Sequence, residues 1–258
     1  RFRAEFEIPP APGPDGGESI YLCGNSLGLL PRRARAVLNR ELDDWGRLAV
    51  EGHFHAHAPW FRYHEQFAAP LARLVGGTPE EVVAMNSLTV NLHLLMASFY
   101  RPTAARHKIL IDGPTFPSDL YAVKSQLAFH GHDPAEGLIA LQPRPGEETL
   151  RTDDILATLE RQGDAIALVL LAGVNFYTGQ AYDMARITAA ARARGCVVGW
   201  DLAHAAGNIP LRLHDWGVDF AAWCHYKYVN AGPGAVAGAF VHERHARRPD
   251  LPRLAGWW

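Results

Sequence analysis

The sequence predicts an α/β fold, with a mixed, mostly parallel sheet and helices on both faces. Short apolar runs rich in β-branched residues occur at 108–112, 138–141, 165–174 and 196–200. The first three precede segments with helical spacing of apolar residues, including 152–162 and 183–194. This alternation is typical of βαβ units. A length of 258 residues suits one large α/β domain or two small ones.

The composition is that of an ordinary globular protein, with 48% hydrophobic and 20% charged residues. The net charge of −2 gives no electrostatic reason to expect nucleic acid or an anionic membrane as a partner. The longest uncharged apolar run, 165–174, is too short to cross a bilayer. Cys23, Cys196 and Cys224 form no CxxC motif, and the last two lie in apolar runs. We therefore predict reduced thiols and a cytoplasmic protein.

Residues 1–30 are predicted to form an N-terminal arm and the turn that follows it, and residues 31–258 one large domain. The arm is extended because it is rich in proline and glycine, and 20–28 is a short strand running into a glycine-rich turn. Pro31 is predicted to be the first residue of a helix that ends near Val50.

Two histidine-rich segments are weak candidates for a metal site. His53, His55 and His57 alternate in a loop with no carboxylate to complete a ligand shell. The segment 242–245 (HERH) lacks the i, i+4 histidine pair of a zinc-binding helix, so we expect a solvated turn. We predict no metal.

Residues 78–99 contain a predicted buried helix preceded by a possible anion site. Thr78-Pro79-Glu80-Glu81 is a capping box, and the apolar positions from Leu88 to Phe99 recur at helical spacing. At the start of this helix, the hydroxyls of Ser87 and Thr89 lie beside free backbone N–H groups. Such a helix end binds phosphate well, although serine and threonine also cap helices that bind nothing.

The loop after 108–112 has the sequence GPTFPSD. Ser118 is a plausible helix cap there. Phe116, held between two prolines, could instead lie flat against a planar ring.

The most informative stretch is 196–228. Asp201 ends one apolar run, His204 follows it, and Lys227 comes just after the run 219–225. Single Asp and Lys residues at strand ends usually lie in water, but placing both in an apolar setting is costly.

Pyridoxal phosphate chemistry uses such a pair. The cofactor aldehyde reacts with a lysine amine, here Lys227. A carboxylate, here Asp201, keeps the pyridine nitrogen protonated. His204 would stack on the ring or orient it. Ligands of parallel sheets bind at the carboxyl ends of strands, where these residues fall.

The pattern Asp201-x-x-His204-x-x-Gly207, followed by Tyr226-Lys227 and by NAGPG at 230–234, resembles the fold-type-I pyridoxal-phosphate enzymes. Within them it is most similar to the kynureninase family. The narrower resemblance rests on NSLG at 25–28, FPSD at 116–119, YTGQ at 177–180 and Tyr226-Lys227. It covers nearly the whole chain.

The resemblance implies hydrolysis of the Cβ–Cγ bond of L-kynurenine, or of its 3-hydroxy form, to anthranilate or 3-hydroxyanthranilate and L-alanine. It also implies a homodimer with the active site at the subunit interface. Leu88 and Thr89 match the phosphate-binding pair. Phe116 would lie on the pyridine face and Asp119 near the cofactor. Tyr226 would shuttle a proton or only bind the phosphate, and both roles stay open.

Three further residues match family positions. Ser26 and His53 have the spacing of the pair that contacts the aromatic ring of the substrate. Trp257 matches a residue that reaches the cofactor phosphate, from its own subunit or from its partner.

Two alternatives remain. Cysteine desulfurase-like and class V aminotransferase-like enzymes usually carry histidine directly before the lysine, whereas here Tyr226 takes that position and His225 is displaced by one. A non-catalytic subunit with the same fold would need neither Asp201 nor Lys227. The first observation favours kynureninase over the desulfurase-like and aminotransferase-like enzymes. The second argues against a non-catalytic subunit.

Family members continue past the position of Trp258 into a small C-terminal domain that carries the arginine for the substrate carboxylate. No residue of this chain is assigned that role. We therefore expect the native chain to continue, and a protein that stops at Trp258 to bind pyridoxal phosphate weakly and to convert kynurenine poorly.

Overall fold

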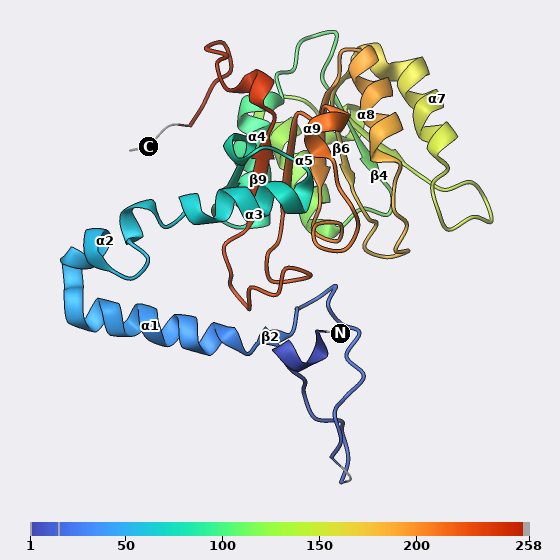
Figure 1. Ribbon diagram of the computed structural model, residues 1–258. Coiled ribbons are helices and arrows are strands. Elements are labelled where there is room, and N and C mark those ends of the chain that lie inside the picture. The colour runs from blue at the N-terminus through green and yellow to red at the C-terminus, as the bar shows by residue number, and fades with distance from the viewer. Residues whose placement is uncertain (1, 15, 255–258) are drawn as a thin grey trace.

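The computed structural model describes residues 2–14 and 16–254, and its body is a seven-stranded sheet with helices packed against it (Figure 1). The strand order is β3-β9-β8-β7-β6-β4-β5. The strands are β3 (Val82–Ala84), β4 (Lys108–Asp112), β5 (Leu138–Leu141), β6 (Ile166–Ala172), β7 (Val197–Asp201), β8 (Phe220–Trp223) and β9 (Gly238–Val241). The helices are α1 (Arg33–Leu48), α2 (Gly52–His55), α3 (Glu65–Val75), α4 (Leu88–Phe99), α5 (Pro117–Phe129), α6 (Pro134–Gly137), α7 (Thr152–Gln162), α8 (Met184–Ala193) and α9 (Leu213–Trp216).

Six of the seven strands run in the same direction, and β9 alone runs in the opposite one. β5, β4, β6, β7 and β8 run in the same direction. β9 pairs antiparallel with β8, and β3 pairs antiparallel with β9. The predicted mixed, mostly parallel sheet is confirmed.

Successive side chains of the central strands pack into two different cores. In β6, Val169 and Leu171 join a cluster with residues of α7 and α8, whereas Leu168 and Leu170 join a second cluster with residues of α4 and α5. Because side chains alternate between the faces of a strand, the two clusters lie on opposite faces of the sheet. Helices therefore cover both faces, as predicted.

The N-terminal part forms a separate two-stranded sheet and a long helix. β1 (Phe6–Glu7) pairs with β2 (Leu30–Pro31), and α1 projects away from the sheet (Figure 1). The prediction that Pro31 starts the helix is wrong by two residues, because Pro31 is paired in β2 and α1 begins at Arg33. The segment that contains His53 and His55 was predicted to be a loop. Instead, a 3-10 turn at Ala49–Glu51 leads from α1 into α2, which contains both histidines.

Among residues 2–14 and 16–254, no helix combines the length and the apolar character that a bilayer crossing requires.

Candidate active site

A pocket lies at the carboxyl edge of the parallel strands. Its wall is formed by the start of α4, the loop before α5, the ends of β6 and β7, and the segment after β8. Of the nine residues predicted to bind the cofactor, seven line this pocket: Leu88, Thr89, Phe116, Asp201, His204, Tyr226 and Lys227. The fold thus brings together side chains that lie up to 139 residues apart in the sequence, from Leu88 to Lys227.

Lys227 is a buried cation in direct contact with His204. Its Nζ donates to His204 Nε2 at 2.8 Å and lies 5.8 Å from the centre of the Phe116 ring. Burial and the Lys227 charge lower the pKa of His204, so the imidazole is neutral and its Nε2 accepts. Only 8% of Lys227 is exposed. The amine is therefore held in place within a largely desolvated site.

Two buried carboxyl groups, those of Asp201 and Asp119, interact with each other, and Asp201 lines the pocket. Asp201 Oδ1 accepts from the backbone N–H of Ala203 at 2.7 Å. Asp119 is equally buried, and its Oδ1 has no hydrogen-bond partner. Burial raises the pKa of Asp119 well above its usual range, and the nearby Asp201 carboxylate raises it further. Two buried acids and an unpaired oxygen are suited to a ligand that brings an N–H group or a positive charge.

The starts of α4 and α5 meet at the pocket through two hydroxyls. Thr89 Oγ1 lies 2.9 Å from Ser118 Oγ. The first intrahelical bond of α4 is donated by Asn91 to Ser87, so the N–H groups of the first turn stay available. The prediction that Ser118 caps α5 is wrong: Phe116 is the N-cap, and Ser118 lines the pocket. This corner has the donors that an anion such as phosphate requires.

The turn that contains Ser26 packs against the backbone of Lys227. Gly28 N–H donates to Tyr226 O at 2.8 Å, and Asn230 Nδ2 donates to Leu29 O at 3.0 Å. A Cβ atom at Gly28 would lie 2.3 Å from Lys227 O, so only glycine permits this approach. Ser26 itself is exposed and does not line the pocket.

His53 lies in a different hollow. It is exposed on α2, and its ring contacts that of Trp60 edge-on at 5.8 Å. The hollow that it lines shares no residue with the pocket around Lys227. Within one chain the structure therefore does not bring His53 to Ser26 or Lys227. Trp257 lies outside the described residues.

A buried network that the sequence analysis missed holds the loop after β6. Asp112, at the end of β4, accepts from Asn175 Nδ2 at 3.0 Å and from Tyr182 Oη at 3.3 Å. Asn175 Oδ1 in turn accepts the backbone N–H groups of Tyr177 and Thr178. The network positions Phe176 in the pocket wall. An acid at the end of a buried strand was the available signal, as at Asp201.

The sequence also predicted a solvated turn at 242–245, which is wrong. His245 is buried and its Nε2 bonds to Asp219 Oδ1 at 2.7 Å, while His242 faces the buried carboxylate of Glu81. Both partners come from distant parts of the chain, which local sequence patterns do not reveal.

The family model for class V aminotransferases matches residues 20–246. The chain belongs to that family. It is 62% identical to a curated kynureninase from Koribacter versatilis and 61% identical to one from Myxococcus xanthus, in each case over 100% of this chain. A kynureninase from Nematostella vectensis is 56% identical. The predicted resemblance to kynureninases is confirmed.

The chain spans about 60% of the length of the two bacterial relatives and 57% of the Nematostella protein. Solved structures show the same fold at lower identity. A C-DES mutant with glycine covalently linked to its PLP cofactor has a TM-score of 0.70 at 21% identity, covering 88% of this chain and 57% of that one. An apo cysteine desulfurase from Thermococcus onnurineus has a TM-score of 0.68 at 18% identity, covering 88% and 54%.

Proposed function

We propose that this chain is the cofactor-binding large domain of a pyridoxal-phosphate-dependent kynureninase. The enzyme hydrolyses the Cβ–Cγ bond of L-kynurenine or 3-hydroxy-L-kynurenine and releases L-alanine with the anthranilate product. The proposal is carried by the convergence of Lys227, Asp201 and His204 in one pocket of a chain that is 62% identical to a curated kynureninase. The desulfurase alternative is supported by shared fold alone.

Residues of the pocket would contact the phosphate, the pyridine nitrogen and the ring of pyridoxal phosphate. The start of α4, with Leu88 and Thr89, would hold the phosphate. The Asp201 carboxylate would accept a hydrogen bond from the protonated pyridine nitrogen, which gives this buried acid a partner. Phe116 and His204, which both line the pocket, would flank the ring. When bound, the cofactor supplies an electrophilic aldehyde and an electron-withdrawing ring.

The residues of the chain then have distinct tasks. Lys227 holds the cofactor and afterwards serves as the base for the proton at the substrate α-carbon. Asp201 keeps the pyridine nitrogen protonated. Burial raises the pKa of Tyr226 to about 12, so this residue keeps its hydroxyl proton and can donate it. Asp119 interacts with Asp201 and, when protonated, can donate a hydrogen bond to its carboxylate.

We further propose a homodimer whose active site includes residues of both subunits. Along α1, Leu38, Leu42 and Trp45 share one face at i, i+4 and i+7, and they are 63%, 60% and 66% exposed. A projecting helix with such a face is typical of an interface between chains. A second copy packed on α1 would bring His53 of one subunit toward the turn that contains Ser26 of the other. The three unpaired cysteines are consistent with a cytoplasmic location.

The test is product formation by the full-length protein. Incubation with L-kynurenine should release fluorescent anthranilate, and Lys227→Ala should lower kcat by about 100- to 10,000-fold because the base is lost. Cysteine serves as the competing substrate. Sulfur release from cysteine without anthranilate from kynurenine would contradict the proposal and favour a desulfurase.

A further inference from the structure

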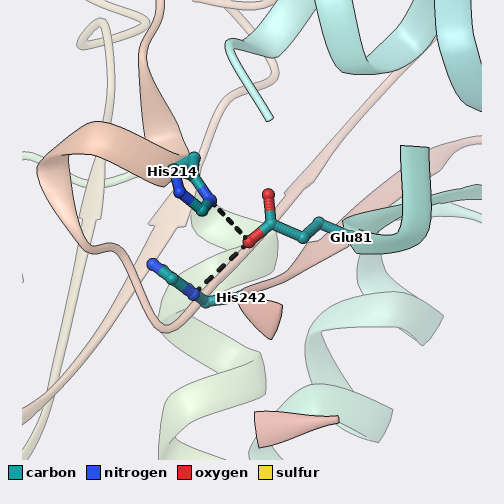
Figure 2. Close-up of side chains that lie close together, drawn as sticks. All are labelled: Glu81, His214 and His242. Atoms are coloured by element: carbon teal, nitrogen blue, oxygen red, sulfur yellow. Dashed lines mark hydrogen bonds and ion pairs between the residues drawn. The ribbon is translucent and has the colours of Figure 1, made fainter. Parts of the chain in front are cut away.

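Glu81, His214 and His242 meet at the end of the sheet opposite the pocket (Figure 2). Glu81 immediately precedes β3, His214 lies in α9, and His242 immediately follows β9. Because β9 runs antiparallel to β8, the end of β9 lies beside the start of β8, where Val241 pairs with Phe220. The pocket around Lys227 begins at the other end of β8. The cluster is therefore separate from the proposed catalytic site.

The carboxylate of Glu81 is completely buried and anchored by backbone donors. Its side chain has 0% exposure. Oε2 accepts from Thr78 N at 2.8 Å, which completes the predicted capping box, and Oε1 accepts from Glu243 N at 2.9 Å. Neither backbone bond involves an imidazole. The acid would therefore keep its position whatever the two histidines bind.

Both imidazoles point at the same carboxylate oxygen (Figure 2). The distances from Glu81 Oε1 are 3.0 Å to His214 Nδ1 and 3.3 Å to His242 Nδ1. The rings stack with their centres 4.8 Å apart. The backbones that carry them are pinned as well, since His214 N donates to Gly76 O and His242 N donates to Asp219 O. Three atoms that can ligate a metal therefore lie close together, each on a segment whose backbone is fixed by hydrogen bonds.

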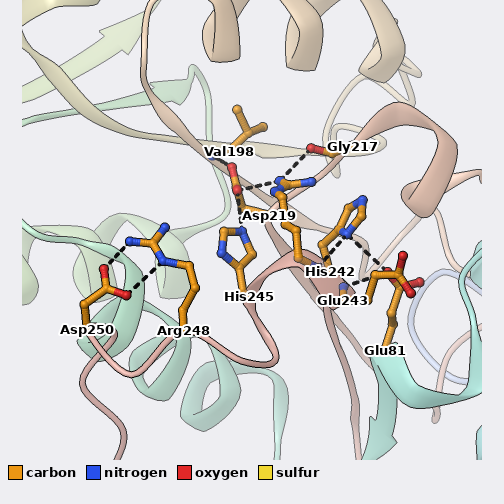
Figure 3. A network of polar contacts seen from close by, with 10 residues as sticks. Glu81, Val198, Gly217, Asp219, His242, Glu243, His245, Arg248 and Asp250 are labelled. Atoms are coloured by element: carbon orange, nitrogen blue, oxygen red, sulfur yellow. Dashed lines mark hydrogen bonds and ion pairs between the residues drawn. The ribbon is translucent and has the colours of Figure 1, made fainter.

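The guanidinium of the neighbouring Arg244 is held by groups outside the cluster. Its guanidinium donates to Asp219 Oδ1 at 2.5 Å and to Gly217 O at 2.9 Å. His245 also bonds to Asp219 (Figure 3). The Arg244 guanidinium therefore does not compete for the Glu81 carboxylate. The Arg244 backbone N–H does donate to His242 Nδ1 at 3.3 Å, and an ion bound to that nitrogen would replace this contact.

We propose that Glu81, His214 and His242 bind a zinc ion. Two imidazoles and one carboxylate, with a water molecule in the fourth position, are a ligand set that zinc accepts. In a tetrahedral zinc site with arms of about 2.0–2.1 Å, neighbouring ligand atoms lie about 3.3 Å apart. The two N–O distances already have nearly this value, and all three atoms lie within 4.8 Å of one another. The imidazoles need to approach each other by at most about 1.5 Å to bind one ion.

The metal would enter from the side of His214, whose side chain is 34% exposed, and a water molecule would complete the tetrahedron. Zinc in this place would fasten the segment before β3, helix α9 and the end of β9. It would thereby hold the antiparallel edge of the sheet, with no part in the chemistry at Lys227. This revises the sequence-based expectation that the chain binds no metal.

The test is zinc binding by the holoprotein after removal of metals with a chelator. Equilibrium dialysis against buffered zinc, with metal content measured by mass spectrometry, should give one tightly bound ion per chain. Gln can still donate to Glu81 but ligates zinc poorly, so His214→Gln and His242→Gln should each weaken binding by about 100-fold or more while the protein stays folded. Zinc should raise the thermal midpoint of the wild type and of neither variant.

His132→Ala is the matched control, because His132 stacks on His107 at 4.6 Å in a histidine pair that belongs to no candidate metal group of the described residues. It should bind zinc like the wild type. Absence of zinc from the wild type at micromolar free zinc would overturn the proposal. Equal binding by His242→Gln and the wild type would overturn it too, and would place the ion elsewhere.

Discussion

Replacement of Gly28 by alanine tests whether the N-terminal turn supports the lysine segment. The new Cβ would lie 2.3 Å from Lys227 O and 2.8 Å from Asn230 Cα, both backbone atoms that cannot rotate away. The turn must therefore shift, which disturbs the bonds from Gly28 N to Tyr226 O and from Asn230 Nδ2 to Leu29 O. Overpacking costs about 1–3 kcal/mol, and each weakened hydrogen bond costs about 0.5–1.5 kcal/mol.

We expect Gly28→Ala to lower the free energy of unfolding by about 2–6 kcal/mol, which shifts the urea midpoint by roughly 1–2 M. Tryptophan fluorescence in urea measures this, and the visible absorbance of the bound cofactor reports the lysine segment in the same titration. Gly24→Ala is the control, because its Cβ would meet nothing closer than 3.7 Å. Equal midpoints for the two variants would refute the contact that we describe.

Three further predictions follow from buried polar groups and from α1. In the apoprotein, the raised pKa of Asp119 means that the native state keeps a proton that the unfolded state loses, so stability falls as pH rises above 3.8. Asp119→Asn should remove this fall, making the apoprotein more stable than the wild type at pH 7 but not below pH 3.8 in urea titrations. Asn175→Ala should cost about 2–4 kcal/mol of stability, because five hydrogen bonds of a buried network are lost, whereas Asn208→Ala, at an exposed site, should cost under about 1 kcal/mol. Leu38→Glu should convert the dimer to monomers in sedimentation velocity, since it places a charge on the exposed apolar face of α1; an unchanged sedimentation coefficient would exclude that face from the interface.

Local sequence signals determined much of the fold. Strand β5 and helix α7 have the predicted bounds, because the apolar run at 138–141 is short and α7 carries acids in its first turn and ends before Gly163. Strand β9 was not predicted. It has four residues, follows a glycine-rich segment, and pairs antiparallel with β8 on one side and on the other with β3, more than 150 residues away.

The sequence likewise predicted some features of the site and missed others. Asp201, His204 and Lys227 could be assigned because the ends of parallel strands meet at one edge. The position of His53 could not, because α1 is a 16-residue helix, about 24 Å long, that carries it away from Ser26. The Glu81 cluster was also beyond the sequence, which indicated the capping role of Glu81 but not its partners at 214 and 242.

The central claim is that Lys227 holds pyridoxal phosphate, and one measurement tests it directly. The sequence contains three lysines, Lys108, Lys124 and Lys227, and of these only Lys227 lines the pocket. Borohydride reduction of the yellow holoprotein fixes the cofactor on its lysine, and peptide mass mapping then locates it. We predict the added mass on the peptide that contains Lys227. The label on Lys108 or Lys124, or no label on any lysine of a protein that binds the cofactor, would contradict the account.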